Sequence, residues 1–156
     1  RRRYRPATMI RYVSAPSMPV RHNFEEFGTA HAPVHAQAYA ELAQGRKSGH
    51  WMWFVFPQIA GLGTSAMARR FAIVSVEEAW AYYRHPVLGP RLIECARLVS
   101  AIEGRSAREI FGAPDDLKFR SSMTLFSHAE TGEGCFKSAP EKYFDGEQDP
   151  LTLARI

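Results

Sequence analysis

Polar residues stand on both sides of the most apolar run in the chain, residues 51–57. They are Arg46, Lys47, His50 and Gln58. Two cations, a titratable imidazole and an amide beside aromatic side chains suit a phosphate or carboxylate, because ligand sites combine an apolar wall with a few convergent polar groups. We therefore predict a pocket for a small anionic or nucleotide-like ligand, with Trp51 in its aromatic wall. The structural alternative is a solvated basic turn after a helix C-terminus, beside a histidine at the edge of the core.

A second polar group lies on a helix predicted for residues 115–128. Its candidate ligand-binding members are Asp116, Lys118, Ser121 and Ser122. Lys118 and Ser122 share one helix face through their i,i+4 spacing, and Asp116 could orient Lys118. We expect this helix to form the other side of the pocket. The alternative is again structural, because acids are favourable at a helix start and small serines let helices approach closely.

Three further patterns carry little chemistry. Residues 61–66 fit the loose pattern GxGxxA, but a dinucleotide site needs a βαβ unit that the sequence does not indicate. His31 and His35 have an i,i+4 spacing, yet Pro33 lies between them and no third metal ligand is indicated. Cys95 lies on an apolar helix stripe, where packing is expected. We predict no metal and no cofactor, and the sequence leaves open whether the protein is an enzyme, because no catalytic residue can be named.

Positive charge is concentrated at the start of the chain. Residues 1–22 contain six arginines and no acid, whereas the rest of the chain has 14 basic and 16 acidic residues. A basic arm of this kind could bind nucleic acid or an anionic surface, but a leader explains it equally well. Elsewhere nucleic-acid binding is not expected, because the aromatic run lacks interleaved basic residues.

Length and composition indicate a single soluble domain. A chain of 156 residues can bury a substantial core without disulfide or metal support. Its longest apolar run, residues 51–57, is far shorter than the ~20 residues of a membrane span, so we expect no membrane insertion. Two cysteines without a CxxC pair suggest reduced thiols and a cytoplasmic location. The oligomeric state cannot be deduced.

Helical signals recur along most of residues 23–156. Ser75 with Glu78, and Ser106 with Glu109, have the spacing of capping boxes. Helices are predicted for residues 33–45, 65–71, 75–83, 91–102, 115–128 and 136–144, with a final turn capped by Asp149. The fold class is therefore mainly α, a compact multihelical single domain. Residues 51–56 also resemble a buried strand, which leaves a small α+β fold as the alternative.

Several motifs connect the chain to a known family. They are GRKSGHWMWFVFPQ at 45–58, GLG at 61–63, HPVLGPRL at 85–92, IFG at 110–112, PDDLK at 114–118 and SSMTLF at 121–126. Over residues 23–156 the chain resembles the bacterial DUF1810 family, a domain of unknown function sometimes mislabelled calpastatin. The resemblance implies a compact multihelical fold and brings no established reaction, cofactor or catalytic residue. A non-enzymatic protein-interaction module is thus the alternative to a ligand-binding domain.

Overall fold

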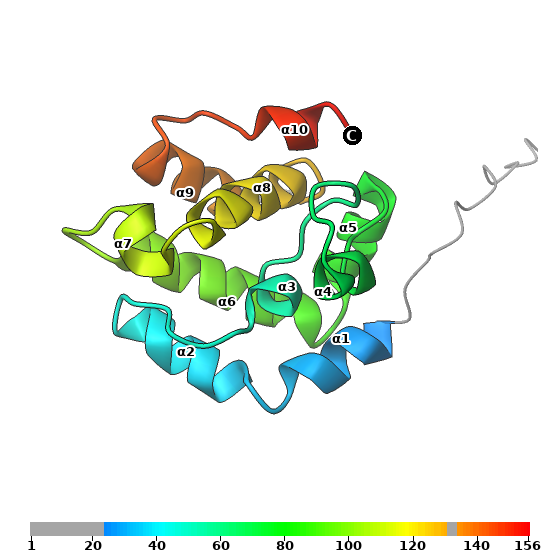
Figure 1. Ribbon diagram of the computed structural model, residues 1–156, viewed down its shortest axis with the longest axis horizontal. Coiled ribbons are helices and arrows are strands. Elements are labelled where there is room, and N and C mark those ends of the chain that lie inside the picture. Colours follow the sequence, from blue (N-terminus) through cyan, green and yellow to red (C-terminus); the bar gives the residue numbers. More distant parts are fainter. Residues whose placement is uncertain (1–23, 131–133) are drawn as a thin grey trace, which may run out of the picture.

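The computed structural model describes residues 24–130 and 134–156, which form ten helices (Figure 1). The basic arm predicted for residues 1–22 lies outside the described residues. The helices are α1 (Phe24–His31), α2 (His35–Ala43), α3 (Met52–Val55), α4 (Ala66–Arg70), α5 (Val76–Arg84), α6 (Leu88–Ala101), α7 (Ala107–Phe111), α8 (Asp115–Ser127), α9 (Cys135–Tyr143) and α10 (Pro150–Leu153).

The mainly α prediction is confirmed, and the α+β alternative is wrong for the described residues. The aromatic run forms the one-turn helix α3, which ends before Pro57. The β-type pairing within residues 24–130 and 134–156 is limited to an isolated parallel bridge between Ile59 and Ile73. That bridge holds the long connection from α3 to α5 in place.

Local capping decides where several helices begin. Ser106 and Glu109 form a complete capping box at α7, and the Ser75 hydroxyl accepts a hydrogen bond from the Glu78 amide at α5. Helix α6 begins three residues before the predicted start at 91 and includes Pro90. A proline in the first turn of a helix costs little, because its missing N–H has no intrahelical acceptor there.

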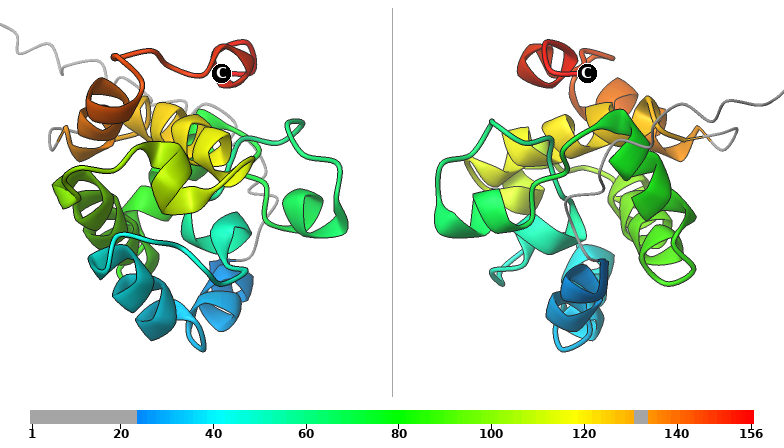
Figure 2. Two further views of the ribbon diagram at one scale, coloured as in Figure 1. Left: turned by 60° about the vertical axis from the view of Figure 1, so that its left-hand side comes forward. Right: turned by 90° about the vertical axis from the view of Figure 1, so that its right-hand side faces the viewer.

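The core is organised around α6 and α8. Helix α6 packs against α2, α3, α5 and α9, while α8 packs against α5, α7, α9 and α10. Helices α1 and α2 lie at one end of the molecule, and α9 and α10 lie at the opposite end (Figures 1 and 2). Residues 121–127 of α8 are all buried, which explains their several small side chains: α8 is enclosed by neighbours on most of its circumference.

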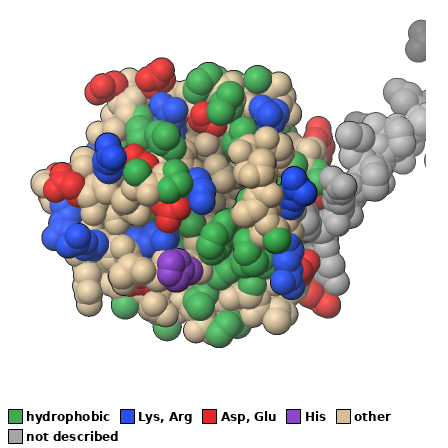
Figure 3. All heavy atoms as spheres, in the orientation of Figure 1, with side chains coloured by type: hydrophobic (Ala, Val, Ile, Leu, Met, Phe, Trp, Pro, Cys, Tyr) green, Lys and Arg blue, Asp and Glu red, His purple; other side chains and the backbone are tan. Residues whose placement is uncertain are grey.

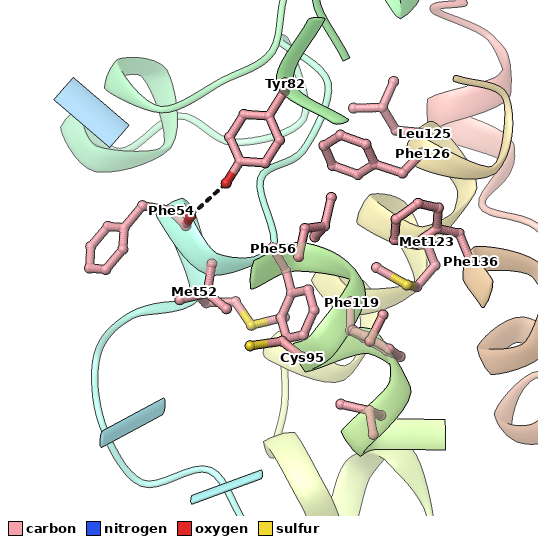
Figure 4. Close-up of a cluster of buried hydrophobic side chains, with 14 of the residues drawn as sticks. Met52, Phe54, Phe56, Tyr82, Cys95, Phe119, Met123, Leu125, Phe126 and Phe136 are labelled. Atoms are coloured by element: carbon pink, nitrogen blue, oxygen red, sulfur yellow. Dashed lines mark hydrogen bonds between the residues drawn. The ribbon is translucent and has the colours of Figure 1, made fainter. Parts of the chain in front are cut away.

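Aromatic side chains fill the centre of this core (Figure 4). The ring of Phe119 on α8 stacks on Phe111 at 4.7 Å between centroids and meets Phe56 edge-on at 5.0 Å. The buried Tyr82 hydroxyl donates a hydrogen bond of 3.2 Å to the Phe54 carbonyl oxygen. The run at 51–56 is therefore mainly core: Phe54 and Phe56 are buried, the Phe54 ring packs against Phe71, and the Phe56 ring packs against Phe119 of α8.

Candidate functional site

The loop that carries Arg46, Lys47 and His50 is fixed by one buried carboxylate. Glu41 on α2 accepts hydrogen bonds from the Ser48 amide (2.6 Å), the Ser48 hydroxyl (2.8 Å) and the Trp51 indole N–H (2.9 Å), as well as from the Gly49 amide. Burial by itself would raise the pKa of Glu41, but the hydrogen bonds from Trp51, Ser48 and Gly49 outweigh it and lower the pKa. The carboxylate thus stays ionised and holds the loop as a rigid turn.

Lys47 points inward and joins this loop to the start of α8. Its ammonium group lies 2.8 Å from Asp115 Oδ2 and donates to the Gly49 carbonyl oxygen at 2.6 Å. It also lies 5.2 Å from the centre of the Trp51 ring. Because the side chain is only 8% exposed, these contacts use most of its binding capacity. Lys47 is therefore a structural clamp in this conformation, whereas the sequence suggested a cation facing a ligand.

Lys118 shares the same carboxylate from the other side. Its ammonium group is 3.4 Å from Asp115 Oδ1 and 5.5 Å from the centre of the Trp53 ring. Asp115 is already neutralised by the shorter contact with Lys47, so two lysines share one negative charge. Lys118 is 29% exposed and keeps an incompletely compensated positive charge at the surface.

A cleft of about 450 Å³ opens beside Lys118, between α8, α10 and the segment that connects α3 to α4. Figure 3 shows this hollow on the face formed by these elements, with basic side chains at its margin. The walls are aliphatic: Leu62, Pro114, Leu117 and Leu151. The polar lining consists of Gln58, Thr64, Ser65, Lys118, Arg120, Ser121 and Asp149.

Arg120 is the most unusual group in the lining. Its guanidinium lies 3.7 Å from Asp149 Oδ1, which is longer than a hydrogen bond, and 5.6 Å from the centre of the Phe144 ring. The buried Nε atom has no hydrogen-bond partner among the described residues, although the side chain is only 19% exposed. A guanidinium has five N–H donors, so several of them are available to a further acceptor.

Asp149 lies beside the Arg120 guanidinium but does not satisfy its hydrogen-bond donors. Its Oδ2 accepts hydrogen bonds from the Ser121 hydroxyl (2.8 Å), the Thr152 hydroxyl (2.6 Å) and the Thr152 amide (3.1 Å), which caps α10. Burial opposes ionisation, but the bonds from Thr152 and Ser121 and the charge of Arg120 outweigh it and lower the pKa of Asp149. The carboxylate is therefore ionised and already occupied by internal donors.

The structure brings together only part of the predicted site. Gln58, Lys118 and Ser121 line the cleft, whereas Arg46 and His50 are exposed on the loop before α3. Trp51 is 1% exposed, so its indole belongs to the core and not to a pocket wall. The remaining two predicted residues do not line the cleft: they are Asp116 and Ser122.

Sequence reasoning missed Arg120 and Asp149. The available signal was an arginine within the otherwise small and apolar stretch 119–127, where a cation requires a partner. Asp149 was predicted as a helix cap, which the structure confirms, but its second contact with Arg120 could not be deduced from spacing.

The described residues contain neither a metal-binding cluster nor a membrane-spanning helix. Within residues 24–130 and 134–156, no group of three or more His, Cys, Asp or Glu side chains could hold a metal ion. The rings of His31 and His35 lie 5.3 Å apart, and the described part of the chain provides no third ligand beside them. No helix in this part of the chain has the length and apolar character needed to cross a bilayer.

These features define a single helical domain with a cationic, aliphatic-walled cleft. The family model described as "Protein of unknown function (DUF1810)" matches residues 21–156, so the chain belongs to this family, as the motifs suggested. A solved structure described as the conserved hypothetical protein Rv1873 from Mycobacterium tuberculosis is 53% identical, with a TM-score of 0.83. The match covers 84% of this chain and 94% of that one. No curated protein shows significant similarity to the chain.

Proposed function

We propose that this protein binds a small anionic ligand in the cleft between α8, α10 and the segment before α4. The observation that carries the proposal is Arg120, a largely buried guanidinium with an unpartnered Nε and one long contact to a carboxylate. Buried donors are normally hydrogen-bonded, and an oxyanion in the cleft would compensate the charge of this guanidinium by accepting from its remaining N–H groups. Lys118, whose charge is shared with Asp115, would supply a second cation.

The distribution of charge supports the same proposal. Outside the first 22 residues the chain has 14 basic and 16 acidic residues, so its body is slightly negative. Among the described residues, the cleft lining nevertheless contains two cations and a single carboxylate, Asp149, whose Oδ2 is occupied by internal donors. Local positive charge on a negative background favours an anion at this position.

The cleft differs from the pocket expected from the sequence in one respect. Its walls are aliphatic and not aromatic, and Trp53 contributes only indirectly, by contact with the Lys118 ammonium group. Aliphatic walls with amide and hydroxyl donors suit a phosphorylated or carboxylated organic molecule with a polar body. Gln58, Thr64 and Ser121 would then orient the body of the ligand.

Isothermal titration calorimetry with inorganic phosphate, sugar phosphates and nucleotides tests the proposal. Lys118→Ala and Arg120→Gln should each weaken binding about tenfold or more, because charge-assisted hydrogen bonds contribute ~1.5–3 kcal/mol. Lys137→Ala removes an exposed lysine of α9 outside the cleft lining and should leave binding unchanged. Wild-type protein that binds no anion at millimolar concentration, or binding that survives both cleft substitutions, would overturn the proposal.

A further inference from the structure

A second cavity of about 550 Å³ adjoins the cleft. The two share four lining residues, Gln58, Gly63, Thr64 and Ala68, so they meet along the segment between α3 and α4. The second cavity continues past these residues to Arg69 on α4. Each cavity alone falls within the ~300–1,000 Å³ range of small-molecule sites.

The chemistry of the second cavity repeats that of the first. Arg69 is exposed and makes no ion pair within residues 24–130 and 134–156, and no carboxylate lines the cavity. Arg155 adds a further cation at the edge, where its guanidinium donates to the Gly61 carbonyl oxygen at 3.3 Å. Both cavities therefore present positive charge, and each does so through cations that do not line the other: Lys118 and Arg120 in the cleft, Arg69 in the second cavity.

The boundary between the cavities is held rigidly. The Ala60 amide donates to the Ile73 carbonyl oxygen at 2.7 Å, and the Ile73 amide donates to the Gln58 carbonyl oxygen at 2.8 Å. A Cβ at Gly63 would lie 2.5 Å from the Ala68 Cβ, so only glycine allows the segment to pass this close to α4. Gln58 and Thr64 are thus presented to both cavities from a fixed backbone.

We propose that the two cavities form one bipartite site for an elongated organic ligand with two anionic groups. One anionic group pairs with Lys118 and Arg120, the other pairs with Arg69, and Gln58 and Thr64 contact the body of the ligand between them. This inference rests on the proposed anion-binding function and specifies its ligand class. A ligand with a single anionic group would leave Arg69 and the second cavity unused.

Two matched pairs of ligands test the inference by calorimetry on the full chain. They are fructose 6-phosphate with fructose 1,6-bisphosphate, and adenosine 5′-monophosphate with adenosine 3′,5′-bisphosphate. In at least one pair the bisphosphate should bind wild-type protein tenfold or more tightly than the monophosphate. Arg69→Ala should abolish that advantage and leave monophosphate affinity unchanged, because the exposed Arg69 contributes only to the second cavity.

Two variants separate this inference from the proposed function. Lys118→Ala should weaken the monophosphate and the bisphosphate alike, and Lys137→Ala should weaken neither. The bipartite site is wrong if the second phosphate raises wild-type affinity less than tenfold in both pairs, or if Arg69→Ala leaves that gain in affinity intact. In either case, weaker binding by Lys118→Ala would still support the anion cleft. If wild-type protein binds none of the four ligands, both proposals fail.

Discussion

Replacing Glu41 with glutamine tests whether one carboxylate holds the loop before α3. Glutamine has the same shape, but its NH₂ group must face one of the N–H or O–H groups whose hydrogen bonds the wild-type carboxylate accepts. With the amide oxygen toward Ser48 and Gly49, the NH₂ group opposes the buried Trp51 indole N–H. An unsatisfied buried donor costs ~1–3 kcal/mol, and the other bonds lose their charge assistance. We expect the free energy of unfolding to fall by about 3 kcal/mol, a large part of the ~5–15 kcal/mol typical of a domain.

The same variant should change how stability depends on pH. The pKa of Glu41 in the folded protein is below the usual glutamate value of 4.5, so the unfolded state binds the proton first as the pH falls. The stabilisation by the carboxylate is thus fully present above pH 4.5 and is lost as the pH falls through the folded pKa. Asp149 contributes in the same direction in both proteins. Glutamine does not titrate, so the variant should lose less stability in acid than the wild type.

Urea unfolding followed by tryptophan fluorescence and circular dichroism, from pH 7 to pH 3, measures both effects. Glu141→Gln, an exposed substitution on α9, is the matched control and should change stability by no more than ~0.5 kcal/mol. A loss of less than ~1 kcal/mol for Glu41→Gln at pH 7, or an acid dependence identical to that of the wild type, would refute the assigned role of this carboxylate.

Three further predictions concern stability. Burial lowers the pKa of His31 to about 3 from the ordinary 6.5, so the unfolded chain binds a proton first and stability should fall by about 2 kcal/mol from pH 7 to pH 5. His31→Phe should remove most of that slope in urea titrations, because only the smaller contribution of His35, whose pKa burial also lowers, is left. An unchanged slope would assign it to other groups. Gly89→Ala should lower the free energy of unfolding by more than ~3 kcal/mol, because its Cβ would lie 2.0 Å from a backbone carbonyl oxygen of α5. Gly28→Ala in α1 meets nothing within 4 Å and should raise the free energy of unfolding by ~0.5–1 kcal/mol. Equal melting temperatures for the two glycine variants would contradict the packing described. Lys47→Ala should lower the free energy of unfolding by ~2–3 kcal/mol and Lys118→Ala by less than ~1 kcal/mol, because the first lysine is 8% exposed and the second 29%. A larger loss for Lys118→Ala than for Lys47→Ala in urea unfolding would contradict the role of Lys47 as a structural clamp.

Much of the secondary structure could be predicted because helix signals are local. The capping pair Ser106 and Glu109 and the apolar stripe of Leu92, Cys95 and Val99 involve residues that are neighbours along one or two helical turns. Their effect does not depend on the rest of the fold, so the helices were predicted close to their true positions. The family could be identified for the same reason, since its motifs are contiguous segments.

Tertiary structure alone decided the orientation of side chains within those segments. The sequence placed Trp51 and Lys47 beside a ligand, but Glu41 binds the indole and Asp115 binds the lysine, and both become parts of the scaffold. Arg120 became a candidate anchor only because α10 brings Asp149 next to it. Such contacts join residues that are distant along the chain, and their strength depends on burial and on competing partners. Neither quantity is encoded in residue spacing, and both are established only when the helices pack.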